Sequence, residues 1–178
     1  MQKEILAFWF EELAMADWFK SSPALDQEIK RRFADVHHQA VQCELFDWRS
    51  TADGRLAEII ILDQFSRNIY RDSAQAFSSD SMALVLAQEA VNLGCDSYLT
   101  AIQKSFMYMP YMHSESLKVH EQAVTLFESN GLAGNTEYEF KHKVIIERFG
   151  RYPHRNKILG RQSTEEEIEF LKQPGSSF

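Results

Sequence analysis

The sequence has few of the residues that β-rich folds, disulfide-rich secreted folds and membrane spans require. Only seven Gly and four Pro interrupt the 178 residues, and a strand-rich fold needs more turn residues than that, so helices are favoured. The two cysteines, Cys43 and Cys95, form neither a C-x-x-C pair nor a disulfide framework. No apolar run approaches the length of a membrane span, and no signal-peptide pattern is present. These absences predict a cytoplasmic protein without a membrane partner.

The apolar content indicates one folded domain. Hydrophobic residues make up 44% of the chain and aromatic residues 12%, and this much apolar surface can offset the conformational entropy lost on folding. A length of 178 residues suits a single domain. The formal net charge of -7 disfavours binding to nucleic acid, whose phosphates attract basic surfaces. We therefore expect a globular domain with no nucleic-acid partner; the composition gives no sign of its oligomeric state.

Apolar residues recur at helical spacing along most of the chain. Pro23 and Pro110 are typical of a first helical turn, and Gly94 and Gly150 of a helix end. The segment 54–69 is apolar around most of its circumference, so we expect it to form a central, buried helix. The predicted helices cover residues 5–13, 23–41, 54–69, 82–93, 110–130, 136–149 and 164–171.

Capping patterns support the last two of these helices. The pattern S/T-x-x-E occurs at Thr136–Glu139, and again at Ser163–Glu166 or Thr164–Glu167. About seven helices joined by short loops, with no convincing alternating strand, make the predicted class all-α. We expect one helical domain over residues 1–172 and a mobile tail at 173–178.

Charge is distributed unevenly along the chain. The segment 141–161 holds seven basic residues and one acidic residue, so it carries +6 and the rest of the chain carries -13. Guanidinium groups match carboxylate and phosphate oxygens, and Gly150 and Pro153 make the core of this segment, residues 148–156, an irregular loop suited to display them. Two interpretations are open, an anion site and ion pairs with acidic helices. The candidate ligand-binding residues from this segment are Arg148, Arg151, Arg155, Asn156 and Arg161.

A second candidate segment is Leu62–Asn68, LDQFSRN, followed by Arg71. On a helix, Asp63 and Arg67 are one turn apart and continue the apolar face, where a charged pair is unusual. An exposed pair of this kind would contribute only ~0.3–0.5 kcal/mol. We expect Asp63 to orient Arg67 toward a ligand or toward the arginine-rich loop. Arg67, Asn68 and Arg71 therefore join the candidate ligand-binding residues.

The third segment, Phe106–Glu115, reads FMYMPYMHSE. Met and aromatic residues at this density are more often core than ligand contacts. His113, Ser114 and Glu115 are too close in sequence to form a Ser-His-acid triad on one helix. A zinc or iron site at His113 and Glu115 would need a distant histidine, and the spacing does not point to one. With no Gly-rich phosphate loop or nucleotide-binding fingerprint, we expect no metal and no cofactor.

Together these segments resemble one family, the bacterial domain of unknown function 924 proteins. The resemblance rests on FWF at 8–10, WF at 18–19, GRLAEIIILDQFSRNIYR at 54–71, AFSSD at 76–80, FMYMPYMHSE at 106–115, RFGRYPHRN at 148–156 and LGRQSTEEEIEFL at 159–171. It covers nearly the whole chain and implies an all-helical, tetratricopeptide-like superhelical bundle. Family members usually have Pro where this chain has Ser66. The family has no established activity, so the resemblance implies no reaction.

Three functions fit these residues. The first is a helical binding module that places arginines around the carboxylate or phosphate of a small molecule or peptide, with a protein partner also expected from a helical-repeat fold. The second is a hydrolase for a small anionic substrate, with His113 or His154 as general base, Glu115 or Asp63 as orienting group, and arginines stabilising developing charge. The third is structural, with the charged motifs holding the helices together through ion pairs.

Overall fold

The computed structural model describes residues 1–177, which form helices and connecting loops without a strand. In chain order the elements are α1 (Gln2–Ala7), η1 (Phe8–Glu12), α2 (Pro23–Val41), η2 (Phe46–Ser50), α3 (Ala52–Ile60), η3 (Ile61–Phe65), α4 (Ser66–Ile69), η4 (Ala74–Phe77), α5 (Asp80–Asn92), η5 (Cys95–Tyr98), α6 (Ala101–Met112), α7 (Leu117–Asn130), α8 (Ala133–Phe149), η6 (Pro153–Arg155) and α9 (Glu165–Phe170). The all-α, single-domain prediction is confirmed. No helix within the described range is long and apolar enough to cross a membrane.

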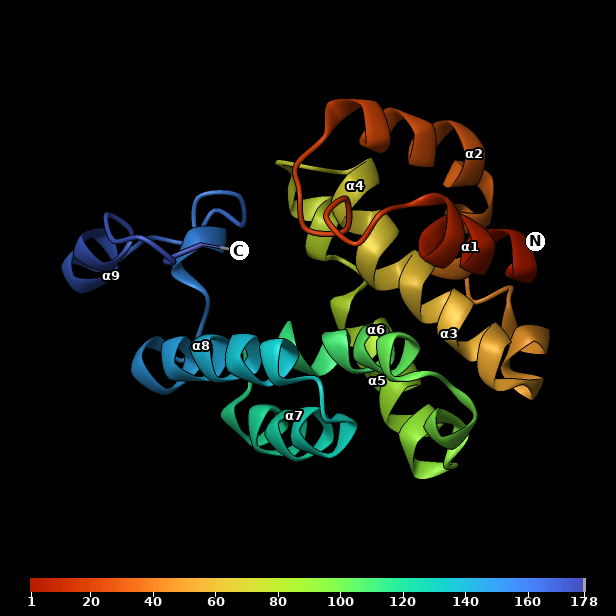
Figure 1. Ribbon diagram of the computed structural model, residues 1–178. Helices are drawn as coiled ribbons and strands as arrows, with labels where there is room; N and C mark the ends of the chain where they lie inside the picture. Colours follow the sequence, from red (N-terminus) through yellow and green to blue (C-terminus); the bar gives the residue numbers. More distant parts are fainter. Residues whose placement is uncertain (178) are drawn as a thin grey trace.

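Figure 1 shows α1 to α4 gathered at one end of the molecule and α9 at the other, with α6, α7 and α8 between them. The central helix consists of α3, η3 and α4, which continue one another from Ala52 to Ile69. It begins beside Thr51, whose hydroxyl accepts a hydrogen bond from the Gly54 amide. Every residue from 56 to 66 is buried, as the apolar pattern predicts. Its middle, η3, is a π-helical turn, a feature that often occurs at functional sites.

The main core packs aromatic rings against one side of the central helix. Phe33 of α2 stacks on Phe65 with ring centroids 5.1 Å apart. Trp9 of η1 meets the same ring edge-on at 5.7 Å and contacts Phe106 of α6 at 5.5 Å. Burying each of these side chains contributes about 1.5–3 kcal/mol. Because this packing holds Phe65, the last residue of η3, it helps to fix the positions of the polar residues just before it.

The C-terminal half holds the arginine-rich loop against the rest of the fold. α7 packs against both α6 and α8. A second apolar cluster, Ile145, Ile146 and Tyr152, lies where α8 gives way to the loop. The rings of Phe149 and Phe170, 5.0 Å apart, hold α9 beside the end of α8. The loop between α8 and α9 is therefore anchored at both ends.

The predicted helix beginning at Pro110 is wrong. Pro110 lies inside α6, and a new helix, α7, begins at Leu117. The sequence signal that was overlooked is a capping box at the start of α6, formed by Thr100 and Gln103. Because Pro110 has no N–H to donate to the carbonyl four residues earlier, α6 loses one hydrogen bond close to its C-terminal end.

Other capping predictions differ in outcome. The predicted helix at 23–41 coincides with α2, and the capping box Thr164–Glu167 is present at the start of α9. Thr136, in contrast, lies inside α8, and its hydroxyl donates to the Phe127 carbonyl near the end of α7 at 3.1 Å. In the predicted tail, Ser176 is buried and its hydroxyl donates to the carbonyl of Leu171. Phe178 lies outside the described residues.

Candidate functional site

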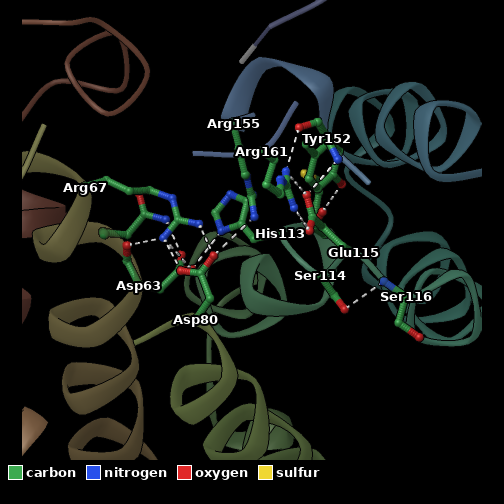
Figure 2. A network of polar contacts seen from close by, with 12 residues as sticks. Asp63, Arg67, Asp80, His113, Ser114, Glu115, Ser116, Tyr152, Arg155 and Arg161 are labelled. Carbon is green, nitrogen blue, oxygen red and sulfur yellow. Dashed lines mark hydrogen bonds and ion pairs between the residues drawn. The ribbon is translucent and has the colours of Figure 1, made fainter. Parts of the chain in front are cut away.

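A pocket of about 300 Å³, here called the α5–α6 pocket, opens beside the start of α5, the end of α6 and the loop after α8. Its apolar lining consists of Ala74, Phe77, Leu84, Pro110 and Leu159. Its polar lining consists of Ser78, Asp80, Ser81, His113, Ser114, Glu115 and Arg155. Three residues that the sequence nominated, His113, Glu115 and Arg155, therefore face one pocket (Figure 2).

Asp63 and His113 form a buried pair at the edge of this pocket. The π-helical turn presents Asp63, whose side chain is 1% exposed, to the residue that follows α6. Nδ1 of His113 lies 2.7 Å from Oδ1 of Asp63, and Nε2 of Gln64 donates to Oδ2 at 2.6 Å. Burial favours the neutral acid, but Arg67 and His113 outweigh burial and hold the pKa of Asp63 well below its usual range. Asp63 is thus an ionised acceptor that orients the imidazole.

Arg67 connects the central helix to the start of α5. Its Nη1 and Nη2 reach the two carboxylate oxygens of Asp80 at 2.9 and 3.0 Å. Nη1 also donates to the Asp63 carbonyl oxygen at 2.6 Å and lies 3.2 Å from its Oδ1. A bidentate pair of this kind fixes both orientation and distance. Arg67 therefore holds Asp63 and Asp80 in place (Figure 2).

Arg155 has few protein partners for so buried a cation. Its side chain is 8% exposed, and the one polar contact that it makes with the described residues is a long one, 3.4 Å from Nη1 to Oδ2 of Asp80. Nε is fully covered without a hydrogen-bond partner, and Nη2 has none among residues 1–177. The guanidinium packs against the rings of Phe77 and Tyr152, at 4.7 and 4.5 Å. Burial and the charge of Arg67 lower the pKa of Arg155, although arginine remains protonated at neutral pH.

Glu115 is bound to Arg161 and not to His113. Nη1 and Nη2 of Arg161 reach its carboxylate oxygens at 2.6 and 2.9 Å, and the Tyr152 amide donates to Oε1 at 2.7 Å. Arg161 also donates to the Tyr152 carbonyl at 3.1 Å and to Oδ1 of Asn156 at 2.9 Å. This Glu115–Arg161 pair joins the loop after α8 to the connection between α6 and α7. Of the two acids proposed to orient His113, Asp63 contacts it and Glu115 does not.

Three candidates from the arginine-rich loop contact α9 or the residues just before it. Arg148 pairs with Glu166 at 2.8 Å. Arg151 donates to both oxygens of Glu167, at 2.6 and 2.8 Å. The Asn156 amide donates to Glu167 at 3.3 Å as well. None of the three lines the α5–α6 pocket.

Two more candidates, Asn68 and Arg71, face α2. The Asn68 amide donates to Oδ1 of Asp26 at 2.8 Å. Arg71 donates to both oxygens of the same carboxylate, at 2.6 and 2.7 Å. Asp26 thus gathers both side chains on the side of the central helix that is packed against α2, outside the pocket lining.

His154, the alternative general base, packs against the ring of Tyr152 with centroids 5.5 Å apart. Burial, with a further contribution from Arg155, lowers the pKa of His154 to about 4. Its imidazole is therefore neutral at pH 7. Because His154 is absent from the pocket lining, His113 is the better placed of the two histidines to meet a bound molecule.

The formal charges around the pocket balance when His113 is neutral. Burial and the charge of Arg67 lower the pKa of His113, and the opposing effect of Asp63 does not overcome them. Among the other residues labelled in Figure 2, three carboxylates and three guanidinium groups carry formal charge. They are Asp63, Asp80, Glu115, Arg67, Arg155 and Arg161. A bound ion must therefore be held by donors or acceptors that these ion pairs leave unoccupied.

Two residues important to this site, Asp80 and Tyr152, were not among the sequence candidates. The carboxylate of Asp80 accepts hydrogen bonds from Arg67 and Arg155. Tyr152 supplies an aromatic face for Arg155 and donates its hydroxyl to the Met112 carbonyl at 2.5 Å. Both lie inside segments that carry the family resemblance, AFSSD and RFGRYPHRN, which was the one signal that could have singled them out.

The arrangement offers two chemical capacities at one pocket. Arg155 is a cation with unused donors, and His113 is an imidazole whose Nε2 has no partner among the described residues. Such groups can bind an anion and accept a proton. Within residues 1–177, no group of three or more His, Cys, Asp or Glu side chains could hold a metal ion.

Comparison with known proteins gives a family and no activity. The model of the family described as "Bacterial protein of unknown function (DUF924)" matches residues 5–175. Among solved structures, a protein of unknown function from Agrobacterium tumefaciens, ATU0120, is 34% identical with a TM-score of 0.91, over 96% of each chain. No curated protein matches the sequence. Because the family match spans the central helix, the pocket and the arginine-rich loop, the chain belongs to the DUF924 family of bacterial proteins of unknown function.

Proposed function

We propose that this protein is a binding module that holds a small anion, a carboxylate or a phosphate, in the α5–α6 pocket with Arg155 as the principal contact. The supporting observation is the state of Arg155, which is 8% exposed and makes one polar contact of 3.4 Å. Buried donors in native proteins are nearly always hydrogen-bonded. An anion in the pocket would supply the acceptor that Nη2 lacks and would offset the repulsion between Arg155 and Arg67.

The other candidate arginines have less to gain from a ligand. Arg67, Arg71, Arg151 and Arg161 each make two hydrogen bonds to a carboxylate, and the exposed Arg148 pairs with Glu166. These pairs support the structural interpretation for those five residues. The proposed ligand-binding set is therefore narrower than the sequence suggested, and it centres on one arginine.

Pocket size and charge limit the ligand. A volume of about 300 Å³ lies at the small end of ligand sites. The unused donors of Arg155 suit one anionic group, whereas the balanced charges around the pocket oppose a polyanion such as nucleic acid. The start of α5 adds the positive end of a helix dipole at Asp80 and Ser81. We propose a small cytoplasmic molecule or the carboxyl terminus of a peptide, bound by a tetratricopeptide-like fold; a protein partner would dock through such a peptide.

One observation favours the hydrolase as a second candidate. His113 and Asp63 lie 2.7 Å apart, which is the distance at which a carboxylate orients an imidazole for proton transfer. Arg155, facing the same pocket, would stabilise negative charge on a bound substrate. If this candidate is correct, His113→Gln should remove turnover of a small anionic ester while leaving its binding to Arg155 intact.

The binding proposal is tested by calorimetric titration with inorganic phosphate and with acetate, together with thermal unfolding in the same salts. Arg155→Met keeps the side-chain stem and removes the guanidinium. At ten times the dissociation constant, a bound anion should stabilise the wild type by about 1.4 kcal/mol, or ~3–6 °C in Tm. Arg155→Met should lose this shift.

Arg148→Met is the matched control, because Arg148 is 45% exposed and lies outside the pocket. It should keep the anion-dependent shift. Equal stabilisation of wild type and Arg155→Met, or no binding of either anion to the wild type, would overturn the proposal.

A further inference from the structure

The inference concerns the imidazole of His113, which faces the same pocket as Arg155. We infer that His113 gives the pocket a hydrogen-bond acceptor, so that it selects small anions that also carry a hydroxyl group, such as 2-hydroxycarboxylates. This inference rests on the proposed anion site and specifies the class of ligand that the site takes. It depends on which nitrogen of His113 carries the proton.

Asp63 fixes that nitrogen. An ionised carboxylate accepts hydrogen bonds and has none to donate, so the Nδ1 that lies 2.7 Å from Asp63 must carry the hydrogen. The Asp63 carboxylate is held in position by Gln64 at 2.6 Å and by Arg67 at 3.2 Å. With the hydrogen on Nδ1, neutral His113 presents a lone pair at Nε2. That nitrogen points away from Asp63 and has no partner among residues 1–177.

The surroundings of His113 keep the imidazole neutral at pH 7. Burial and the charge of Arg67 lower its pKa more than Asp63 raises it. The charged and titratable groups near His113 come from the central helix, α5, the connection after α6, α8 and the arginine-rich loop. They are Asp63, Arg67, Asp80, Glu115, His142, His154 and Arg155.

The pocket therefore presents a donor and an acceptor together. Arg155 donates, and Nε2 of neutral His113 accepts. A simple carboxylate such as acetate accepts hydrogen bonds from Arg155 but has no hydrogen to donate to Nε2 of His113. A 2-hydroxycarboxylate such as glycolate places its carboxylate on Arg155 and donates its hydroxyl to Nε2. Sites built to bind a hydroxyl discriminate strongly against analogues that lack it, and we expect glycolate to bind about 10-fold more tightly than acetate.

The test compares glycolate and acetate as probes, by NMR or calorimetric titration of the full chain at pH 7.5. His113→Phe should abolish the difference between the two probes and leave acetate binding within about twofold. Asp63→Asn is the second variant, because an amide can donate to Nδ1 and shift the hydrogen to Nε2. It should reduce or reverse the preference, and the ring ¹⁵N shifts of His113 should report the change of tautomer.

Titrations at lower pH provide an independent test of the role of His113. Below the pKa of His113, Nε2 becomes a donor, so acetate binding should strengthen and the preference for glycolate should disappear. Equal wild-type affinity for both probes at pH 7.5, with binding lost in Arg155→Met, would overturn the role of His113 and leave the anion site standing. Binding of neither probe, or binding that Arg155→Met does not change, would overturn the anion site and this inference with it.

Discussion

Replacing Arg161 with Met is expected to destabilise the fold more than replacing Arg148, an exposed arginine of the same segment. Arg161 donates two charge-assisted hydrogen bonds to Glu115 at 2.6 and 2.9 Å. Its side chain is 24% exposed and that of Glu115 is 28% exposed, so solvent screens the pair only in part. A hydrogen bond to a charged group contributes about 1.5–3 kcal/mol. Taking the low end for both bonds to allow for screening, Arg161→Met should lower the free energy of unfolding by about 3 kcal/mol.

The partner variant isolates the charge. Glu115→Gln keeps an oxygen that can accept from the Tyr152 amide, so it should lower the free energy of unfolding by less, about 2 kcal/mol. If the two side chains act through each other, the double variant should show a coupling energy of about 1.5–2 kcal/mol. The same cycle on Arg148 and Glu166, which are 45% and 63% exposed, should give less than about 0.5 kcal/mol.

Urea unfolding at neutral pH measures these differences, with midpoints compared at unchanged m-value. A loss of about 3 kcal/mol corresponds to a fall in Tm of ~6–12 °C for a chain of this size. If the coupling energy between Glu115 and Arg161 is as small as that between Arg148 and Glu166, the reasoning is refuted. In that case the loop after α8 is held by its apolar contacts and not by this ion pair.

Three further predictions test the fold around the pocket. Gly54→Ala should lower the free energy of unfolding measured by calorimetry by more than about 2 kcal/mol, despite alanine's helix propensity. The reason is that the new Cβ would lie 2.1 Å from the Trp48 carbonyl oxygen. A neutral or stabilising result would contradict this close approach. Tyr152→Phe should cost about 1–3 kcal/mol in urea unfolding, since it leaves the buried Met112 carbonyl without its hydroxyl donor; a loss below ~0.5 kcal/mol would contradict this. The pKa of Asp63 is lowered in the folded state, so the stability that its charge contributes is complete above about pH 5 and falls as the pH drops through the pKa of the unfolded chain, near 4. Asp63→Asn should therefore flatten this part of the curve of unfolding free energy against pH. An unchanged curve would argue against an ionised Asp63.

Local sequence patterns predicted the helices whose signals lie within one continuous segment. The apolar face and initial proline of residues 23–41 suffice for α2, and the nearly uniform apolar character of 54–69 suffices for the central helix. The pattern failed at Pro110, where a residue that favours helix starts stands near a helix end. A rule based on the proline alone cannot separate these cases, because the start of α6 is set by the capping box of Thr100 and Gln103, which begins ten residues before Pro110.

The site was only partly predictable, because its partners are distant in sequence. His113 contacts Asp63 across 50 positions, Arg161 contacts Glu115 across 46, and Arg155 contacts Asp80 across 75. Residue type and motif can nominate each side chain. They cannot say which acid meets which base, since that is decided by how α5, α6 and the loop after α8 pack around the central helix.

The same long-range pairing explains why a segment that carries +6 supplies a single candidate ligand contact. Acids from elsewhere neutralise most of its arginines: Glu166 and Glu167 come from α9, and Glu115 comes from the connection between α6 and α7. Arg155 differs because it must share Asp80 with Arg67, whose two contacts at 2.9 and 3.0 Å are shorter than the 3.4 Å contact of Arg155. Arg155 therefore keeps hydrogen-bond donors that no residue from 1 to 177 accepts, beside a pocket of about 300 Å³. The proposed anion would accept hydrogen bonds from these donors without disturbing any other ion pair, so the position of the proposed site follows from the allocation of acids and not from the density of arginines.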